Sequence, residues 1–438
     1  GGGAGAGVAA LRVDGGEFKG EGGLTFSAKG ALNLNGGTLT VGKVGAAANL
    51  TVAAGDGVID VATGSVLDVK GDATFNRNAS STGTLTVSQA LNLTQGTFTQ
   101  SNGGSATTVA AATTIGSADK VGVLKLDDGA FKAEGGLTVT TGGTLDINGG
   151  AVTVGKAGAP ANLAVAASGN VTLDLANVSD KGLVVIGGLD IDGAADTPSA
   201  SPIVLNKGTV DVTGTAAIAN RSVTLGGADG AILAVRKADS VDPATDGTLT
   251  VSGKGSLTLG NQASKLQVAE VALADATSSL VFAAAADKTA TAYKISGAGG
   301  VVVKGAVELN KDNTFTGGVT LGTHGNLSLN DLSSIGAEGS RKLVFDGGSV
   351  AFGADLASDA GVAFARKEAD AAIPITANPG AGSVFNIDQK LTGVGLVQVG
   401  ATAGSIALNN ETNDFEGAVG VTAGTLKLSK LATLGKGV

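Results

Sequence analysis

Residues 11–58 read LRVDGGEFKGEGGLTFSAKGALNLNGGTLTVGKVGAAANLTVAAGDGV, and residues 124–171 read LKLDDGAFKAEGGLTVTTGGTLDINGGAVTVGKAGAPANLAVAASGNV. The two stretches align without a gap at an offset of 113, because position 11 matches position 124, and 28 of their 48 positions are identical. A shorter repeat follows, in which NTFTGGV at 313–319 is echoed by NDFEGAV at 413–419, at an offset of 100. Repetition of this kind is typical of elongated, stacked architectures, which commonly act as surfaces, spacers and stalks.

The composition fits a narrow, glycine-rich β-structure better than a wide globular core. Among 438 residues there are 73 glycines, aromatic residues make up 3%, and tryptophan is absent. A wide core usually takes large aromatic rings, whereas small aliphatic side chains fill a core that is one strand pair wide. Disorder is disfavoured because apolar residues reach 43% and the mean hydropathy is +0.29. Collagen is excluded because glycine has no three-residue period.

Charge and cysteine content narrow the partners and the environment. The net charge is −9 and the sequence has no basic stripe, so nucleic acid is not expected as a partner. The lack of cysteine rules out disulfides and thiolate metal sites, and it suits a chain that crosses an oxidising periplasm unfolded. Because the chain contains no methionine, we expect a fragment of a longer precursor.

Short alternating segments predict β-strands along the whole chain. The stretches 24–27, 38–41 and 66–69 alternate apolar with polar side chains, and Gly-Gly or Asn-Gly steps separate such runs. The offset of 113 divides into about five units of roughly 20–25 residues, the length of one β-helical coil. We therefore predict an all-β protein with very little helix, folded as a right-handed, three-sided parallel β-helix, a solenoid of the pectin-lyase-like kind.

Three zones of one solenoid are expected, with no hinge between them. Residues 1–175 hold the long repeat, residues 176–294 are less regular, and residues 295–438 hold the shorter repeat. Within the middle zone the polar stretches 192–201 and 236–246 are expected to bulge out as loops.

The last zone carries one order of motifs twice. Its first copy runs through G-x-G at 297–299, L-N at 309–310, NTFTGG at 313–318, G-x-L-x-L at 325–329 and I-G at 335–336. The second copy keeps this order between Gly393 and Gly435, with departures at Asp414, Glu416 and Ala418. This order resembles the passenger-associated transport repeat of bacterial autotransporters, the type V secreted surface proteins.

The resemblance implies a passenger segment that is threaded through the outer-membrane translocator barrel of the same polypeptide and folds at the bacterial cell surface. It implies a non-catalytic, rigid β-helical stalk that supports secretion and adhesion or aggregation, with roles in biofilm formation and virulence. The expected partners are that barrel and either a host-cell or matrix ligand or a second copy. Two alternatives remain open: a passive stalk whose enzymatic domain, such as a protease, lies outside this chain, and a haemagglutinin-like filament secreted by a two-partner system.

The residues of the transport-like motif have simple expected roles. They are Asn313, Phe315, Gly317, Gly318, Asn413, Phe415 and Gly417. The phenylalanines are expected to stack in the core, with a recognition role as the alternative. The asparagines are expected to take left-handed backbone angles or to cap a corner.

Residues that could carry catalysis are sparse, so we predict no enzyme, no metal site and no cofactor. The only histidine, His324, falls in a predicted turn and has no counterpart in the second copy, which favours an exposed turn residue over a catalytic triad. Paired acids on a β-helix could hydrolyse polysaccharide, but few aromatic residues accompany them. We expect solvated carboxylates near turns at Asp14, Asp127, Asp128, Asp174 and Asp346.

The two long copies also share several larger side chains, namely Phe18/Phe131, Lys19/Lys132, Glu21/Glu134 and Lys43/Lys156. The phenylalanines are expected in the core. The lysines and glutamates are expected to form a solvated face, with a ligand-contacting ladder as the alternative.

Overall fold

The computed structural model describes residues 10–176, 180–193, 203–227, 230–237, 242, 246–260, 264–283, 291–359, 361–368, 372–377, 379, 381–430 and 434. Within these residues the secondary structure is almost entirely β-strand, as predicted, and includes one 3-10 turn, η1 (Leu332–Ile335). In the part of the chain so described, no helix is long and apolar enough to span a membrane.

Contacts divide the chain into two compact units, Gly1–Pro243 and Ala244–Val438. The boundary falls inside the expected middle zone, and the division into three zones stays a prediction. The expected loops at 192–201 and 236–246 lie largely outside the described residues.

The first unit consists of three ladders of parallel strands. The first ladder contains β1 (Ala10–Val13), β4 (Ala31–Leu34), β7 (Ile59–Val61), β10 (Ala79–Ser81), the first parts of β13 (Gly96–Val109) and β15 (Gly122–Ala133), β17 (Gly143–Ile147), β20 (Asn170–Asp174), the first part of β23 (Ile203–Thr213) and β25 (Ser222–Leu225). The second contains β2 (Glu17–Gly20), β5 (Thr38–Val41), β8 (Val66–Val69), β11 (Thr84–Val87), the later parts of β13 and β15, β18 (Ala151–Val154), β21 (Leu183–Ile186), the later part of β23 and β26 (Ala231–Arg236).

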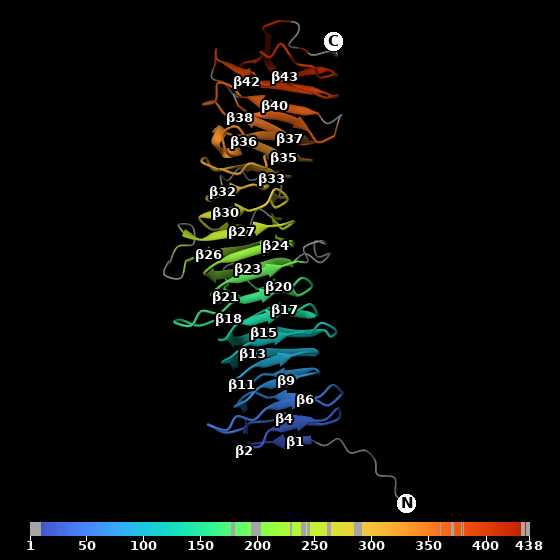
Figure 1. Cartoon of the computed structure of the whole chain (residues 1–438), viewed down its shortest axis with the longest axis vertical. Helices are drawn as coiled ribbons and strands as arrows, with labels where there is room; N and C mark the ends of the chain where they lie inside the picture. The colour runs from blue at the N-terminus through green and yellow to red at the C-terminus, as the bar shows by residue number, and fades with distance from the viewer. Residues whose placement is uncertain are drawn as a thin grey trace, which may run out of the picture. The chain divides into compact units, whose positions relative to one another are not determined.

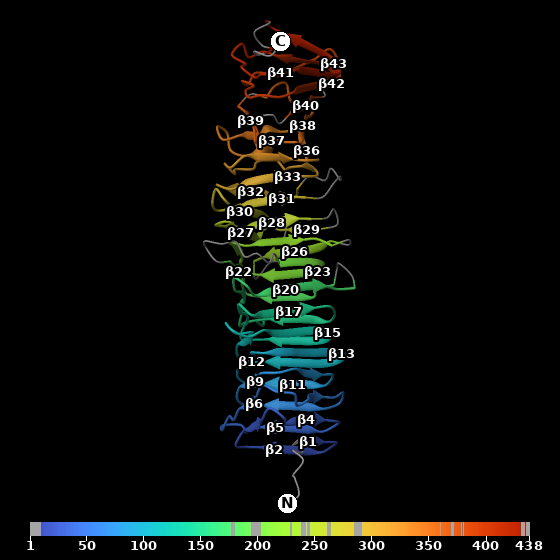
Figure 2. The same ribbon diagram turned by 90° about the vertical axis from the view of Figure 1, so that its right-hand side faces the viewer.

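The third ladder of this unit contributes one short strand per coil. It contains β3 (Leu24–Phe26), β6 (Leu50–Val52), β9 (Ala73–Phe75), β12 (Leu91–Leu93), β14 (Thr113–Ile115), β16 (Leu137–Val139), β19 (Leu163–Val165), β22 (Leu189–Asp192) and β24 (Ala216–Ala219). In Figure 1 the colour of this unit runs from blue at β1 to green at β23 along the stack, and in Figure 2 β6, β9 and β12 lie one above another.

The strand register confirms that the 113-residue offset between the two long copies corresponds to five coils. Five successive spacings between paired positions span the offset of 113: 21 from Leu11 to Leu32, 27 from Leu32 to Ile59, 20 from Asp60 to Ser80, 19 from Ala79 to Phe98 and 26 from Phe98 to Leu124. The two copies also pair alike, since Leu24 faces Leu50 and their counterparts in the second copy, Leu137 and Leu163, face each other.

Alternation of side chains explains why these segments form a solenoid. In β5 and β11 the leucine and the valine point inward and are fully buried, whereas the two threonines are only partly covered. Stacking then places aliphatic side chains on one another, as at Leu39, Leu67 and Leu85, which are neighbours in the second ladder. Burial of such a side chain stabilises the fold by about 1.5–3 kcal/mol, so a narrow core suffices when it recurs in every coil.

Glycine is required where the corner between the second and third ladders folds back on itself. Gly42 and its counterpart Gly155 have φ angles of 82° and 78°, which L side chains rarely adopt. A Cβ at Gly42 would lie 2.6 Å from the backbone nitrogen of Ala48. A Cβ at Gly155 would lie 2.7 Å from the nitrogen of Ala161, the counterpart of Ala48.

The second unit is also a stack of parallel strands. One ladder joins β27 (Thr248–Ser252), β30 (Glu270–Leu273) and β32 (Lys294–Gly297). Another joins β28 (Ser256–Leu259), β31 (Ser279–Phe282), β33 (Gly300–Val303), β35 (Val319–Gly322), β37 (Lys342–Asp346) and β39 (Ala363–Arg366). The unit also contains β29 (Lys265–Gln267).

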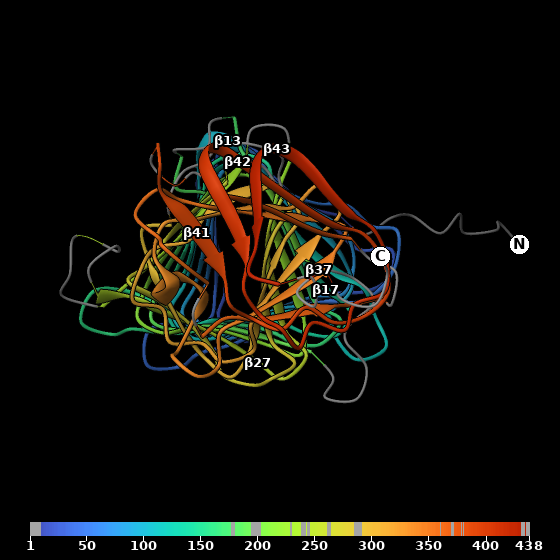
Figure 3. The ribbon, with the colours of Figure 1, turned by 90° about the horizontal axis from the view of Figure 1, so that it is seen from above.

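A third set begins at β34 (Ala306–Glu308), β36 (Asn326–Leu329), β38 (Ser349–Phe352) and β40 (Ile373–Ala377). It ends at β42 (Val397–Leu408), which pairs with β40, β41 (Val384–Ile387) and β43 (Val419–Leu428). Figure 3 looks down on β42 and β43 lying side by side. Each unit is therefore a parallel β-solenoid, as predicted, while the handedness of the coil and the number of its flat sides stay predictions.

Candidate functional site

The first motif asparagine lies buried at a corner of the second unit and bridges three coils. The side-chain oxygen of Asn313 accepts a hydrogen bond of 2.7 Å from the backbone N–H of Ile295, one coil earlier. Its amide nitrogen donates to the carbonyl of Asn310 at 2.9 Å and to that of Ser334, one coil later, at 2.8 Å. The side chain thus takes the place of a backbone partner at a corner where the strand ladder is interrupted.

The second motif asparagine repeats the key bond. Asn413 is buried, and its side-chain oxygen accepts a hydrogen bond of 2.8 Å from the N–H of Leu391. Neither asparagine takes a positive φ; the neighbouring Asp312 does, with a φ of 66°. Of the two expected roles, the structure therefore supports the capped corner.

The motif phenylalanines are core residues, as expected. Phe315 and Phe415 are both fully buried. The backbone of the next coil also comes close to this position, since a Cβ at Gly336 would overlap the carbonyl oxygen of Phe315. A ring in this place is covered from outside and offers no surface for recognition.

The motif glycines permit close contact between coils. A Cβ at Gly317 would lie 2.6 Å from the carbonyl carbon of Gly299. Gly417 has a φ of 149°, and a Cβ there would overlap the backbone of Gly395. Gly318 has a φ of 77°. The motif residues therefore connect each coil to its neighbours, through side-chain hydrogen bonds and close backbone contacts.

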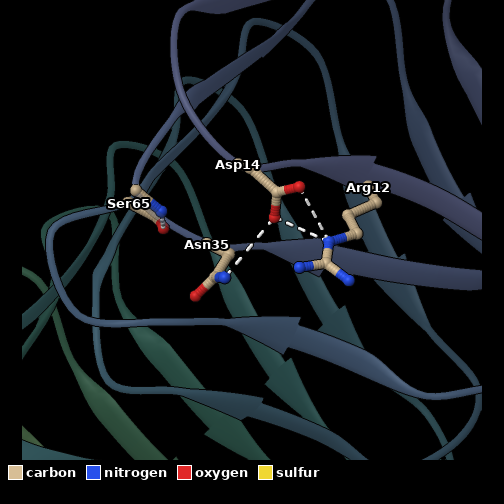
Figure 4. A network of polar contacts seen from close by, with 5 residues as sticks. Arg12, Asp14, Asn35 and Ser65 are labelled. Atoms are coloured by element: carbon tan, nitrogen blue, oxygen red, sulfur yellow. Dashed lines mark hydrogen bonds and ion pairs between the residues drawn. The ribbon is translucent and has the colours of Figure 1, made fainter.

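Carboxylates near the turns of the first unit lie in polar networks that connect adjacent coils. Arg12 donates through Nε to both oxygens of Asp14, at 2.6 and 2.9 Å, and Asn35 of the next coil donates to Asp14 at 3.4 Å (Figure 4). Beside them the Ser65 hydroxyl accepts from the N–H of Gly36 at 2.7 Å. The hydrogen bond from Arg12 lowers the pKa of Asp14.

The same network recurs in the second copy of the long repeat. Lys125 donates to Asp127 at 2.9 Å, and Asn148 donates to Asp127 at 3.1 Å. The hydrogen bond from Lys125 lowers the pKa of Asp127. A general acid needs a raised pKa, so the two aspartates are held in the form that cannot donate a proton at neutral pH.

The other expected carboxylates also lie at the surface or pair locally. Asp346 accepts from Lys367 at 2.8 Å, and Asp128 accepts from the N–H of Gly129 at 2.7 Å. Asp174 is exposed. The structure does not bring these five aspartates together into one group, because each belongs to the turn of a different coil or faces a different partner.

The shared lysines and glutamates pair with one another between coils. Lys43 contacts Glu21 at 3.1 Å, and the counterpart Lys156 contacts Glu134 at 2.6 Å. Lys43, Glu21 and Lys156 are more than half exposed and Glu134 is partly covered, which fits the expected solvated face. Exposed pairs of this kind contribute about 0–1 kcal/mol each. Each pair joins a lysine of one coil to a glutamate of the adjacent coil, which favours the correct register between coils.

Of the two shared phenylalanines, only one is in the core. Phe131 is fully buried, whereas Phe18 is 42% exposed, so the expectation for Phe18 was wrong. The reason is its neighbours: Phe131 lies in β15, between β13 and β18, while β2 pairs only with β5 among the described strands. Beside them, Lys19 contacts Glu17 at 3.2 Å and Lys132 is exposed.

His324 lies where the sequence placed it. It is an exposed residue in the turn between β35 and β36, with a φ of 67°. The expectation of an exposed turn residue is therefore confirmed.

The sequence reasoning missed a buried arginine that fastens a corner. Arg77 is only 5% exposed, and its guanidinium donates to the carbonyls of Ala28 and Gly30, both at 2.8 Å. These acceptors lie two coils away, at the corner between β3 and β4. Burial lowers the pKa of Arg77, although an arginine remains charged.

A second arginine has the same arrangement. Arg221 is fully buried and donates to the carbonyl of Ala166 at 2.9 Å and to that of Gly169, again two coils away. The available signal was local, because both arginines follow an asparagine directly after a third-ladder strand, at Asn76 and Asn220.

A buried acid in the second unit was also missed by the sequence reasoning. Asp359 is fully buried; one oxygen accepts from the N–H of Asp388 at 2.8 Å, and the other has no partner among the described residues. Burial raises its pKa to about 7, and the charge of Asp388 adds to the rise.

Comparison with known proteins gives no match: no protein-family profile, no curated protein and no solved structure is similar to this chain. The features that bear on function are therefore the contacts between coils and the surfaces that the coils present.

Proposed function

We propose that this chain is a non-catalytic passenger segment of a bacterial autotransporter, in which it forms a rigid β-solenoid stalk that supports secretion and adhesion or aggregation at the cell surface. Its partners would be the translocator of the same polypeptide and a ligand on a host cell, on a matrix or on a second copy.

The observation that carries the proposal is the pairing of each coil with its neighbours in sequence. Paired residues within the first unit lie one coil apart along the chain, as at Ala79 with Phe98 and Leu32 with Ile59. A chain of this kind can add one coil at a time to those already formed. Stepwise folding suits a polypeptide that emerges from a pore in an unfolded state.

The transport-like motif supports the same proposal. Asn313 and Asn413 each satisfy a backbone N–H of the preceding coil, at Ile295 and Leu391. A new coil therefore brings its own cap for the one before it. The lack of cysteine adds to this, because no disulfide can form before export.

A polar outer surface supports the adhesive part. In the third ladder of the first unit, the first six strands each present one outward side chain, and this row reads Thr25, Thr51, Thr74, Asn92, Thr114 and Thr138 before Ala164 follows in β19. Strands in a ladder are about 4.8 Å apart, so these polar side chains recur at a short spacing, with an amide at Asn92 among the hydroxyl groups. Many weak contacts with such a row can add up to firm attachment.

An in-frame deletion in the natural gene tests the proposal. Residues 11–290 are removed and residues 295–438 are kept, and surface display and cell adherence are measured on the same cells. Normal display with lost adherence is the expected result.

The other outcomes separate the alternatives. Normal display with normal adherence would make the deleted coils a passive spacer and would favour a stalk that carries an activity elsewhere. Loss of display would support the role in export, and adherence would then be measured with the purified chain. Activity that depends on a separate secretion partner would favour the two-partner filament.

A further inference from the structure

In the first unit, two long corners between the third and first ladders enclose two short ones, and this difference in length leaves a notch. Between the third ladder and the first, the corner 53–58 joins β6 to β7 and the corner 116–121 joins β14 to β15. The two coils between them have much shorter corners, at 76–78 and 94–95. We call the space enclosed by these four corners the corner notch.

The corner notch is large enough for a small ligand. It consists of two adjoining hollows of about 520 and 500 Å³, which share Gly55 and Asn78 in their linings. Volumes of this size are usual for ligand sites.

Its hydrogen-bonding groups include several with no partner in the described part of the protein. The side-chain oxygen of Asn78 accepts from the N–H of Thr97 at 2.8 Å, which fixes the amide and leaves its nitrogen without a partner among the described residues. The amide of Gln95 and the hydroxyl of Thr99 also have no partner within the described chain. Amides and hydroxyls both donate and accept, as the hydroxyl groups of a sugar do.

The charges that line the notch balance. Asp56 and Asp119 are acidic, and Arg77 and Lys120 are basic. A site of no net charge offers little attraction to a strongly charged ligand, so the lining favours an uncharged one.

Apolar contact is available at both ends. Val58 is 58% exposed and Val121 is 65% exposed, and each ends one of the long corners. The C–H faces of a sugar ring can cover such small aliphatic surfaces.

Two backbone N–H groups that line the notch are already bonded, which disfavours an added peptide strand. The N–H of Gly57 donates to Ala28 at 3.3 Å, and the N–H of Gly96 donates to Val121 at 2.9 Å. An extended peptide needs an open strand edge, and these corners present none within the described residues.

Hydrogen bonds from a buried arginine hold part of the notch lining in place. Arg77 lines it and is held by its bonds to Ala28 and Gly30. A site that is ordered before binding loses less entropy when the ligand arrives. Three of the four corners also lie between the two long copies of the repeat, so this arrangement of corners is not duplicated with it.

We propose that the corner notch binds a short, uncharged oligosaccharide through the amides of Asn78 and Gln95 and the hydroxyl of Thr99. The proposal rests on the adhesive part of the proposed function and gives it a class of ligand. Its test uses the purified chain, so a failure here is distinguishable from a failure of export or display.

Binding is measured by saturation-transfer NMR and titration with neutral tetrasaccharides of glucose, mannose, galactose or N-acetylglucosamine, and with a heparin tetrasaccharide as the charged probe. Two variants remove notch contacts: Gln95→Ala, and Asn78→Asp, which keeps the acceptor for Thr97 but loses the donor. Gln89→Ala is the matched control, because Gln89 is an exposed glutamine at another corner of the same stack.

At least one neutral tetrasaccharide should bind, and each notch variant should weaken it roughly fivefold to tenfold, the effect of one lost hydrogen bond. Gln89→Ala should bind as the parent chain does, and circular dichroism should show all variants folded. The proposal is overturned if no neutral probe binds, if only heparin binds, or if the notch variants and the control behave alike.

Discussion

At the scale of single residues, buried polar side chains satisfy backbone groups that the strand ladders leave open at corners. Asn313 makes three hydrogen bonds to backbone groups of three successive coils. Each buried backbone group left without a partner would cost about 1–3 kcal/mol. The Asn313 amide supplies hydrogen bonds to three such groups at a position that is closed to water.

Asp359 is a residue of the opposite kind, because burial opposes its charge. Its pKa is raised from 3.8 to about 7. The unfolded chain releases the proton at the lower value and the folded chain at the higher one, so the folded form binds the proton more tightly. Stability from this group is fully present below pH 3.8 and is lost as the pH rises toward 7.

We therefore expect the second unit to lose stability as the pH rises between about 4 and 7, by up to about 1.4 kcal/mol per pH unit. Asp359→Asn should remove this slope, because the amide keeps the acceptor for Asp388 and has no proton to lose. Denaturant unfolding of the full chain, followed at several pH values, measures the effect.

Asp355→Asn is the control for this experiment. Asp355 is an exposed aspartate in the same coil, so the slope should survive its replacement. If the slope is the same in the parent chain and in Asp359→Asn, the buried carboxyl does not control the pH response.

At the scale of elements, the third-ladder strands of the first unit are uniform in length, whereas the corners that follow them vary. In the first unit the third-ladder strands keep lengths of three or four residues, whereas the corners that follow them range from two to six residues in the coils before β17. Arg77 reaches past the long corner 53–58 to hold the corner of the coil beyond it. The long corner 53–58 thus lies between two corners, 27–30 and 76–78, that Arg77 joins by hydrogen bonds.

Replacing Arg77 by methionine should loosen this fastening. Arg77→Met keeps a stem of similar length but removes both donors to Ala28 and Gly30, so the free energy of unfolding of the first unit should fall by about 2 kcal/mol. Amide hydrogen exchange should quicken at the corner 27–30. Denaturant unfolding and exchange measured by mass spectrometry give the two values.

Arg12→Met provides the comparison. Arg12 is exposed and pairs with Asp14 at the surface, so its loss should leave the free energy of unfolding almost unchanged. Equal losses in the two variants would argue that Arg77 contributes no more than a surface charge.

Strands were easier to predict from the sequence than corners, for a physical reason. Period-two alternation marks a half-buried strand wherever it lies, and the offset between copies reports the average coil length. The register of individual residues, such as Leu11 opposite Leu32, came from the structure. Burial of Phe18 depended on a strand pairing on both sides of β2, which alternation does not report. Arg77 bonds to backbone two coils away, and Asp359 bonds to the backbone of Asp388 in the next coil. A single sequence does not record which residues the coils bring together.

At the scale of the whole molecule, the long repeat sets which coils can follow one another. Within the first unit, Phe131 faces Val152 and Leu137 faces Leu163. The counterparts of Phe131 and Leu137 in the first copy are Phe18 and Leu24. A chain that joins the first copy to the coils after the second would keep every one of these contacts in register.

Deletion of residues 33–145 should therefore give a shorter but folded protein. The deletion matches the offset of 113 and joins Leu32 to Asp146, so β1 to β3 would lie against the coils that normally cover β15 and β16. The variant should keep its β-sheet circular dichroism per residue and a cooperative unfolding transition. It should also lose oligosaccharide binding, because the corner notch is removed.

The matched control is deletion of residues 33–135, which joins Leu32 to Gly136 and puts first-ladder residues in front of a third-ladder strand. This out-of-phase chain should aggregate or unfold without cooperativity. Equal folding of both deletions would show that register between the copies does not matter.

The direction of the hydrogen bonds in the first unit also decides how it would respond to tension. Bonds between coils run along the stacking direction, so a pull on the end of the stack loads the outermost coil before the next. Releasing the first coil frees the stretch of chain from Leu11 to its partner Leu32. At about 3.4 Å per extended residue, each release of this kind adds roughly 70 Å of slack. A tether built in this way lengthens step by step under load and keeps its remaining coils intact.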